Sequence, residues 1–181
     1  MTVHIVLFRG VGGATQLPVK PLREALTAAG FKDVATYINS GNAVLSSRKG
    51  AAGVAADVAK IAKKEFGFDK AIHVVTREDW TALIDNNPFP EATQVPKFLH
   101  AAVLAEKPKS GAVDALRAFA RGKEGIEVVG DVAYLYTPDG FGTSKLAEKF
   151  DKGIGVPNTA RNWNTVIALA KLADAIKQGS P

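Results

Sequence analysis

The sequence predicts an α+β protein built from two tandem ferredoxin-like halves of the βαββαβ type, the second incomplete, followed by a C-terminal amphipathic helix. Three observations support this prediction. A β-α-β-β-α-β succession is readable over residues 1–76, and a second β-α-β-β-α succession starts near residue 98. Apolar residues make up 46% of the 181 residues, which is enough to bury a core.

The first half begins with a continuous apolar run, Val3–Phe8, which is typical of a strand buried on both faces. Pro18 suits the first turn of a helix, and Gly30 ends that helix. Residues 39–42 are Asn, Ser, Gly and Asn, which tolerate the backbone angles of a tight hairpin turn. The expected elements are strands at 3–8, 34–38, 43–46 and 71–76, and helices at 18–29, 54–66 and 78–85.

The second half follows the turn-forming segment Asn87-Pro88-Phe89-Pro90, which predicts two domains, residues 1–90 and residues 97–181. No final strand is apparent in this half, so we expect it to be incomplete. An apolar stripe that includes Trp163 and Val166 predicts the C-terminal helix. The expected elements are strands at 98–105, 126–129 and 132–137, and helices at 111–121, 144–150 and 162–177.

Composition excludes several classes of protein. The chain has no cysteine, which excludes disulfides and thiolate metal sites. No apolar run approaches the roughly 18 residues of a membrane span, and the run before Arg9 is too short for a signal peptide, so we expect a cytoplasmic protein without a membrane partner. The net charge of +5 is spread over both halves and not clustered. The sequence indicates no particular oligomeric state.

Two polar loops meet in the predicted fold. Strands one and three of a ferredoxin-like sheet are antiparallel neighbours, so the loop leaving strand one shares a sheet end with the turn before strand three. The loop contains Arg9, Gly12 and Gly13. The turn contributes Ser40 and Asn42. Because glycine-rich backbone presents amides to an anion and a guanidinium binds phosphate with two hydrogen bonds, this sheet end is a candidate phosphate or carboxylate site.

The block Thr159–Thr165 is dense in polar side chains and lies where the last helix is expected to begin. Arg161 is its strongest candidate, because a cation at a helix start opposes the helix dipole unless it pairs with a negative group. We expect Arg161 to face a common cleft with the Arg9 loop and the Ser40 turn. The candidate ligand-binding residues of the block are Thr159, Arg161, Asn162 and Asn164.

Structural roles are the alternative for each of these groups. Paired glycines and an Asn-Ser-Gly turn are also what tight turns require. Thr159 or Asn162 suits the N-cap of the last helix, and Trp163 suits a core position. The three histidines fall in predicted strands without metal-ligand spacing, so no metal site is expected.

Five blocks of the sequence together resemble domain-of-unknown-function family 1697, an uncharacterised and mostly bacterial family. The resemblance extends over nearly the whole chain, and it implies a two-lobed α+β architecture without an established activity, cofactor or catalytic residue. One departure weakens a ligand role for the first loop: the family pattern is Arg-Gly-Ile-Asn-Val-Gly-Gly, and this loop is two residues shorter and lacks the asparagine. The blocks are Phe8-Arg9-Gly10, Gly12-Gly13 with Pro18 and Leu22-Arg23, Thr36-Tyr37-Ile38-Asn39-Ser40-Gly41-Asn42, Asn87-Pro88-Phe89, and Thr159-Ala160-Arg161-Asn162-Trp163-Asn164-Thr165.

The residues favour binding of a small phosphorylated or nucleotide-like anionic ligand, by a binding protein or an enzyme. No carboxylate pair, nucleophile with a base, or metal cluster is readable from spacing, so the sequence names no reaction, catalytic residue or cofactor. Nucleic acid is a disfavoured alternative partner: the net charge and an RRM-like strand order support it, but strand 43–46 offers no aromatic residue for base stacking. A non-catalytic interaction or assembly module is the remaining alternative.

Overall fold

The computed structural model spans residues 1–181 and describes residues 1–12, 15–38 and 41–178. The protein is an α+β protein with two compact units, Met1–Ala82 together with Ile167–Pro181, and Leu83–Val166. The sequence predicts a division between residues 90 and 97. The boundary between the two compact units instead falls within two helices, Arg77–Asp85 and Trp163–Gln178, each of which begins in one unit and ends in the other.

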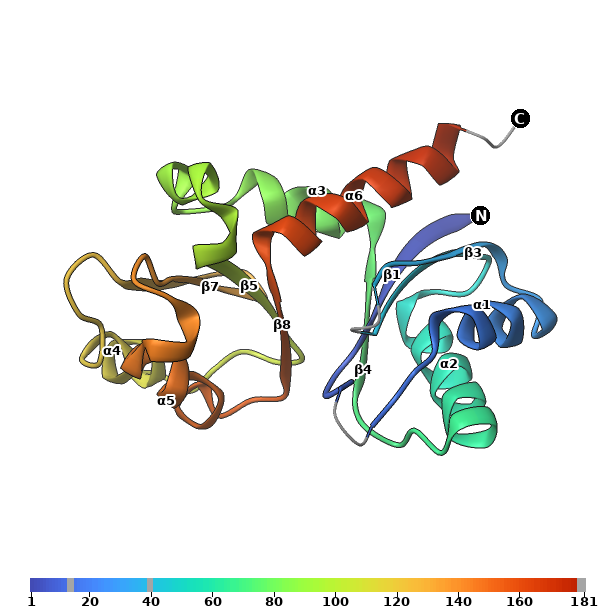
Figure 1. The fold of residues 1–181 in the computed structure, drawn as a ribbon, viewed down its shortest axis with the longest axis horizontal. Helices are drawn as coiled ribbons and strands as arrows, with labels where there is room; N and C mark the ends of the chain where they lie inside the picture. The colour runs from blue at the N-terminus through green and yellow to red at the C-terminus, as the bar shows by residue number, and fades with distance from the viewer. Residues whose placement is uncertain (13–14, 39–40, 179–181) are drawn as a thin grey trace. The chain divides into compact units, whose positions relative to one another are not determined.

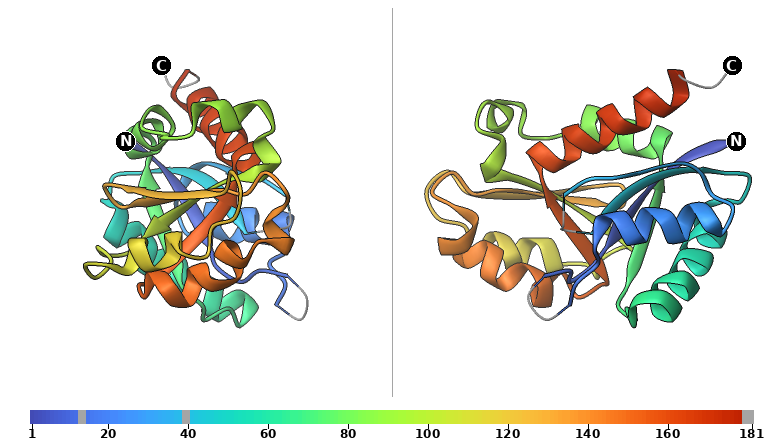
Figure 2. Two further views of the ribbon diagram at one scale, coloured as in Figure 1. Left: turned by 90° about the vertical axis from the view of Figure 1, so that its left-hand side faces the viewer. Right: turned by 45° about the vertical axis from the view of Figure 1, so that its right-hand side comes forward.

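The first unit contains a four-stranded antiparallel sheet (Figure 1). Its main elements are β1 (Thr2–Phe8), α1 (Val19–Ala28), β2 (Lys32–Thr36), β3 (Asn42–Ser47), α2 (Ala51–Phe66) and β4 (Ile72–Thr76). The strand order is β2-β3-β1-β4, so the apolar strand β1 is central, as its continuous hydrophobicity indicates. Figure 2 shows α1 and α2 together on one side of this sheet.

Apolar side chains between this sheet and its two helices form the core of the first unit. Val6 and Phe8 of β1 are buried in one cluster with Leu22 of α1 and Val58 of α2. The alternation of side chains along a strand places Val6 and Phe8 on the same face. α2 ends at Gly67, which adopts the left-handed conformation that glycine tolerates, and the predicted helix stop is confirmed.

The second unit has a sheet of the same kind, with the antiparallel order β6-β7-β5-β8. The helix α3 (Arg77–Asp85) and two short 3-10 helices (Pro90–Gln94 and Pro96–Phe98) precede it. The elements are β5 (Leu99–Leu104), α4 (Ala112–Arg117), β6 (Gly125–Val129), β7 (Val132–Tyr136), a 3-10 helix (Phe141–Thr143), α5 (Lys145–Ile154) and β8 (Asn158–Asn162).

The core of the second unit lies between its sheet and the helices α4 and α5. Ala102 of β5, Leu135 of β7 and Phe150 of α5 are buried in one cluster. Ser144 fixes the start of α5, because its Oγ accepts a hydrogen bond from the Ala147 N–H at 3.1 Å. A serine in this position satisfies one of the amides that a helix start leaves without a partner.

Strand β8 corrects the prediction that the second half is incomplete. It pairs with β5 from Leu104↔Asn158 to His100↔Asn162. Its sequence, Asn-Thr-Ala-Arg-Asn, lacks the apolar alternation that marks a strand, so the ladder with β5 and not its own hydrophobicity defines it. Arg161 therefore lies on a strand, one residue before the N-cap of the last helix.

Helix α4 is shorter than the predicted helix over residues 111–121. The chain tightens after Arg117, where the N–H of Phe119 donates to Leu116 and the N–H of Ala120 donates to Arg117, both at 3.0 Å. These bonds span three residues and are of the 3-10 kind, which ends the α-helical hydrogen-bond pattern. Phe119, which falls within the predicted helix, lies beyond the end of α4 and is 42% exposed.

The last helix, α6 (Trp163–Gln178), starts directly after β8. Asn162 caps it, because the Asn162 Oδ1 accepts from the Thr165 N–H at 3.1 Å. Arg77, at the start of α3, donates from Nε to Asp174 Oδ1 of α6 at 2.7 Å, and its Nη2 forms an ion pair with the same oxygen at 2.6 Å. α3 and α6 run close together in Figure 1. Among the described residues, no helix combines the length and the apolar character that crossing a membrane requires.

Candidate functional site

The end of β1 brings three chain segments of the first unit together. The Phe8 N–H donates to the Gly41 carbonyl at 2.8 Å, and the Arg9 N–H donates to the Ala71 carbonyl at 3.0 Å. Residues 9–12 therefore lie beside the turn before β3 and beside the start of β4. The predicted neighbourhood of the first loop and the turn is confirmed for the described residues. The candidates Gly13 and Ser40 lie outside the described residues.

Gly41 lies at the closest approach of these segments. Its φ is +73°, and a Cβ at this position would meet Val11 Cγ2 at 2.6 Å and Phe8 Cβ at 2.8 Å. Only glycine combines this backbone conformation with this lack of space. The loop after β1 and the turn before β3 therefore pack directly onto each other.

Gly12 pairs with Thr15 within the first loop. Its N–H donates to the Thr15 carbonyl at 2.7 Å, and the Thr15 N–H donates back to the Gly12 carbonyl at 3.0 Å. This amide is thus already bonded, and α1 begins only at Val19, after Pro18. Gly12 consequently shapes the loop, and its N–H reaches an anion only if the bond to Thr15 breaks.

Lys70 is a cation of this sheet end that the sequence analysis missed. Its Nζ donates to the Gly10 carbonyl at 3.0 Å and to the Thr15 Oγ1 at 3.1 Å. Both acceptors are neutral, and Lys70 forms no ion pair within the described ranges. The predicted topology does indicate the position of Lys70. Strand four is antiparallel to strand one, so the residues just before strand four lie where strand one ends.

Asn42, a predicted ligand contact, is engaged by the turn itself. It is 1% exposed, and its Nδ2 donates to the Tyr37 carbonyl at 3.3 Å. The Tyr37 N–H donates to the Asn42 carbonyl at 3.1 Å, which closes the turn from both sides. Ile38, just inside the turn, has a φ of +44° and is 52% exposed. A positive φ is strained for a β-branched residue, and such strain gathers at functional positions.

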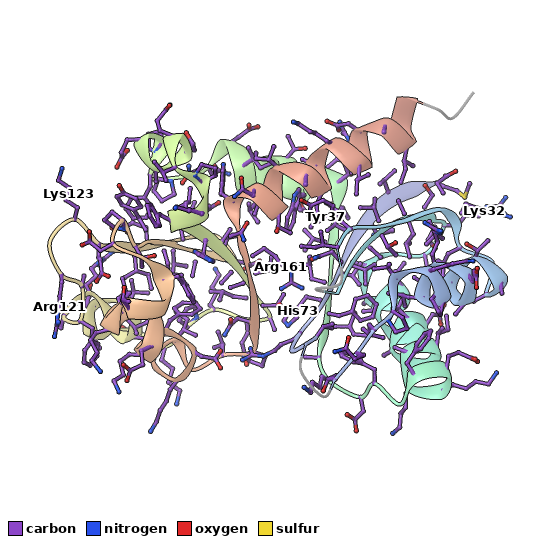
Figure 3. All side chains as sticks on the ribbon, in the orientation of Figure 1. Lys32, Tyr37, His73, Arg121, Lys123 and Arg161 are labelled. Carbon is purple, nitrogen blue, oxygen red and sulfur yellow. The ribbon has the colours of Figure 1, made fainter. Side chains whose placement is uncertain are left out.

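The other predicted site residues lie on β8 and α6. Arg161 Nη1 donates to the Thr159 Oγ1 and to the Ala160 carbonyl, both at 2.8 Å. Burial lowers the pKa of Arg161 to about 10, so the guanidinium, labelled in Figure 3, still carries its charge at neutral pH. Asn164 is exposed on α6. A common cleft of Arg161 with the Arg9 loop stays a prediction.

The three histidines lie in strands, as predicted, at His4 in β1, His73 in β4 and His100 in β5. His4 Nε2 bonds with the Lys49 carbonyl at 3.0 Å, and burial lowers the pKa of His4. The His100 ring stacks beside Phe141 with 4.1 Å between ring centroids, and burial lowers its pKa to about 4. In the described part of the chain, no three His, Asp or Glu side chains gather as metal ligands.

Comparisons with known proteins add a family and a fold. The model of a protein family of unknown function, DUF1697, matches residues 1–134 of this chain. A search of curated proteins found no match. Among solved structures, a conserved bacterial protein from Streptococcus pneumoniae is similar, with a TM-score of 0.74 and 20% sequence identity over 95% of this chain and 98% of that chain. At this identity the likeness shows the fold alone.

Proposed function

Since the chain belongs to the DUF1697 family, as its sequence blocks predict, and this family carries no activity in its description, we propose a function from the chain's own residues. We propose that the protein binds a small phosphorylated or nucleotide-like anion at the sheet end where β1 ends and β4 begins. Arg9 and Lys70 supply the positive charge of this site. The observation that carries the proposal is the convergence of these two cations on one loop.

The hydrogen bonds of Lys70 support an anion at this place. An ammonium group has three donors, and two of them go to the neutral oxygens of Gly10 and Thr15. The third donor and the charge remain for an anion. Arg9 is half-buried, and a guanidinium has the planar pair of donors that matches two phosphate or carboxylate oxygens.

The proposed architecture is a pair of ferredoxin-like halves. Each unit contributes two β-α-β elements in the order βαββαβ, and the strand orders β2-β3-β1-β4 and β6-β7-β5-β8 correspond position by position. This topology supports the proposed site, because it brings the loop after the first strand, the turn before the third and the start of the fourth to one sheet end.

Thermal unfolding with inorganic phosphate, AMP and glucose 6-phosphate tests the proposal. We expect millimolar ligand to raise the melting temperature, because a ligand that binds only the folded state stabilises it. Replacement of Arg9 or Lys70 by Gln removes a charged donor, and we expect each substitution to weaken ligand binding about tenfold. Calorimetric titration measures the dissociation constants of the variants.

The matched control is Lys32→Gln. Lys32 is exposed and pairs with Ser46, which also pairs with Val3, so Lys32 lies at the opposite end of the same sheet (Figure 3). Lys32→Gln should bind the ligands as the wild type does. No melting shift with any ligand, or equal binding by the Lys70→Gln and Lys32→Gln variants, would exclude the proposed site.

We propose Arg161 as a separate anion contact, with its guanidinium oriented by the hydrogen bond to Thr159. Asn162 is occupied as the cap of α6, and Asn164 is exposed on that helix. The same titrations include Arg161→Met. A weaker ligand response supports this assignment. Lower stability with an unchanged ligand response instead assigns Arg161 to packing, as expected for an interaction or assembly module.

Nucleic-acid binding through the first sheet is not favoured by its composition or burial. β3 has the sequence Asn-Ala-Val-Leu-Ser-Ser and offers no aromatic ring for base stacking. Ile5, Leu7 and Val44 are fully buried, so they present no open platform. A salt-dependent shift of single-stranded RNA by the protein in a gel would restore this alternative.

A further inference from the structure

A cavity of about 290 Å³ lies in the second unit, between the loop from β5 to α4 and the end of β6. The loop residues Lys107, Lys109 and Ser110 belong to its polar lining, and Val113 and Val128 belong to its apolar lining. None of these residues belongs to the site proposed above. The cavity is therefore independent of Arg9 and Lys70.

The charge of the cavity lining is positive. Lys107 and Lys109 are exposed, and neither forms an ion pair with any residue that the structure describes. Asp114 is the only carboxylate in the lining, and its Oδ1 is bound by Arg117 Nη1 at 2.6 Å. Two ammonium groups thus remain without a compensating anion, which favours a negatively charged ligand.

Backbone and hydroxyl donors lie on the same loop. The N–H groups of Lys109, Ser110 and Gly111 donate to no acceptor in the described chain, and Ser110 adds a hydroxyl. Exposed donors that no protein acceptor occupies, beside two lysines, match an acceptor group with several oxygens, such as a phosphate. A phosphate satisfies several of these donors at once.

The apolar part of the lining restricts the rest of the ligand. Pro108, Val113 and Val128 present half-buried hydrocarbon to the cavity. Inorganic phosphate leaves this surface in contact with water, whereas an apolar ring or chain attached to the phosphate covers it. We propose that this cavity binds a small organic phosphate whose apolar body packs on Val113 and Val128 while Lys107 and Lys109 contact the phosphate oxygens.

Titration of the isotope-labelled full chain with phenyl phosphate, followed by amide NMR signals, tests the proposal. We expect the signals of Ser110, Gly111 and Gly130 to shift and saturate at millimolar probe. The double substitution K107Q/K109Q should weaken phenyl phosphate binding at least about tenfold, since it removes both charged donors. Lys123→Gln is the matched control, an exposed lysine of the same unit outside the cavity lining (Figure 3), and should change nothing.

Two further probes separate the parts of the proposed ligand. Inorganic phosphate should bind more weakly than phenyl phosphate, and Val128→Ser should reduce that preference, because it removes apolar contact. Phenylacetate should bind more weakly than phenyl phosphate, because a carboxylate has fewer acceptor oxygens. Equal binding of inorganic phosphate and phenyl phosphate would contradict the role of Val128, and tighter binding of phenylacetate would contradict the phosphate assignment.

The variants also separate this cavity from the first site. Lys70→Gln should leave the Ser110 and Gly111 shifts unchanged, and K107Q/K109Q should leave the phosphate response of the first unit unchanged. The inference is overturned if the cavity signals do not move, or if K107Q/K109Q binds phenyl phosphate as tightly as the wild type does. Neither result bears on Arg9 and Lys70.

Discussion

At the scale of single residues, Gly41 shows how one backbone position determines the geometry of the candidate site. Its Cα approaches Val11 and Phe8 so closely that a methyl group has no room. The loop carrying Arg9 is held against the turn before β3 through this contact and the Phe8–Gly41 hydrogen bond. The position of Arg9 therefore depends on a residue that has no side chain.

Gly41→Ala should destabilise the protein by about 2–4 kcal/mol, because it adds overpacking to the strain of a positive φ. Gly67→Ala is the matched control: its φ is +65°, but a Cβ there meets nothing within 4 Å. Backbone strain alone should lower the free energy of unfolding of the Gly67→Ala variant by only about 1–2 kcal/mol. Urea unfolding measures both values, and an equal loss in the two variants would show that the contact with Val11 and Phe8 is unimportant.

The residues of the candidate site were only partly predictable. Arg9 and Gly12 were placed correctly by topology, because strand pairing depends on hydrophobic pattern, which a sequence displays. Lys70 was missed because no local pattern surrounds it, and only its topological position marks it. The engagement of Asn42 with Tyr37 and of Gly12 with Thr15 depends on hydrogen-bond geometry within turns, which residue type alone does not specify.

At the scale of elements, apolar periodicity predicted most of the fold, and the strand that it missed has a clear cause. β1 and α2 follow their own hydrophobic patterns and agree with the prediction within a few residues. β8 has no such pattern, and it is a strand because its backbone pairs with that of β5. An element that its neighbours define is not visible in its own sequence.

The pair of Arg77 in α3 and Asp174 in α6 is an interaction between elements distant in sequence. Arg77 is only 23% exposed and makes a hydrogen bond and a close ion pair to one carboxylate, so we expect a coupling energy of about 1 kcal/mol. A double-mutant cycle with Arg77→Met and Asp174→Asn measures it by chemical unfolding.

The comparison pair is Lys20 and Glu24 on α1, at 3.9 Å and largely exposed, for which the same cycle should give no more than about 0.5 kcal/mol. Coupling no larger for Arg77 and Asp174 than for Lys20 and Glu24 would mean that the Arg77 bonds contribute little to the attachment of α6.

At the scale of the whole molecule, the buried histidines make the free energy of unfolding depend on pH. In the unfolded chain His100 takes up a proton near its ordinary pKa of 6.5, whereas burial lowers its folded pKa to about 4. Between these values the unfolded state binds more protons, so the protein loses stability as the pH falls from 6.5 to 4. The full shift corresponds to up to about 3 kcal/mol.

His100→Leu should flatten this dependence. Across pH 4 to 6.5 the variant should lose about 1.4 kcal/mol less per pH unit than the wild type, because one titrating group is gone. Urea unfolding at a series of pH values measures the slopes. His4, whose pKa burial also lowers, should leave a residual dependence in the variant. Parallel slopes in wild type and variant would show that His100 titrates alike in both states.

The first unit is assembled from two stretches of chain that the entire second unit separates, Met1–Ala82 and Ile167–Pro181. A ribosome releases these stretches on the order of several seconds apart. During synthesis, residues 1–82 therefore leave the ribosome before helix α6, which carries Asp174, the acceptor of the Arg77 hydrogen bond. Residues 83–166 emerge as one uninterrupted segment. The unit whose first residues are translated earlier is consequently the one completed later.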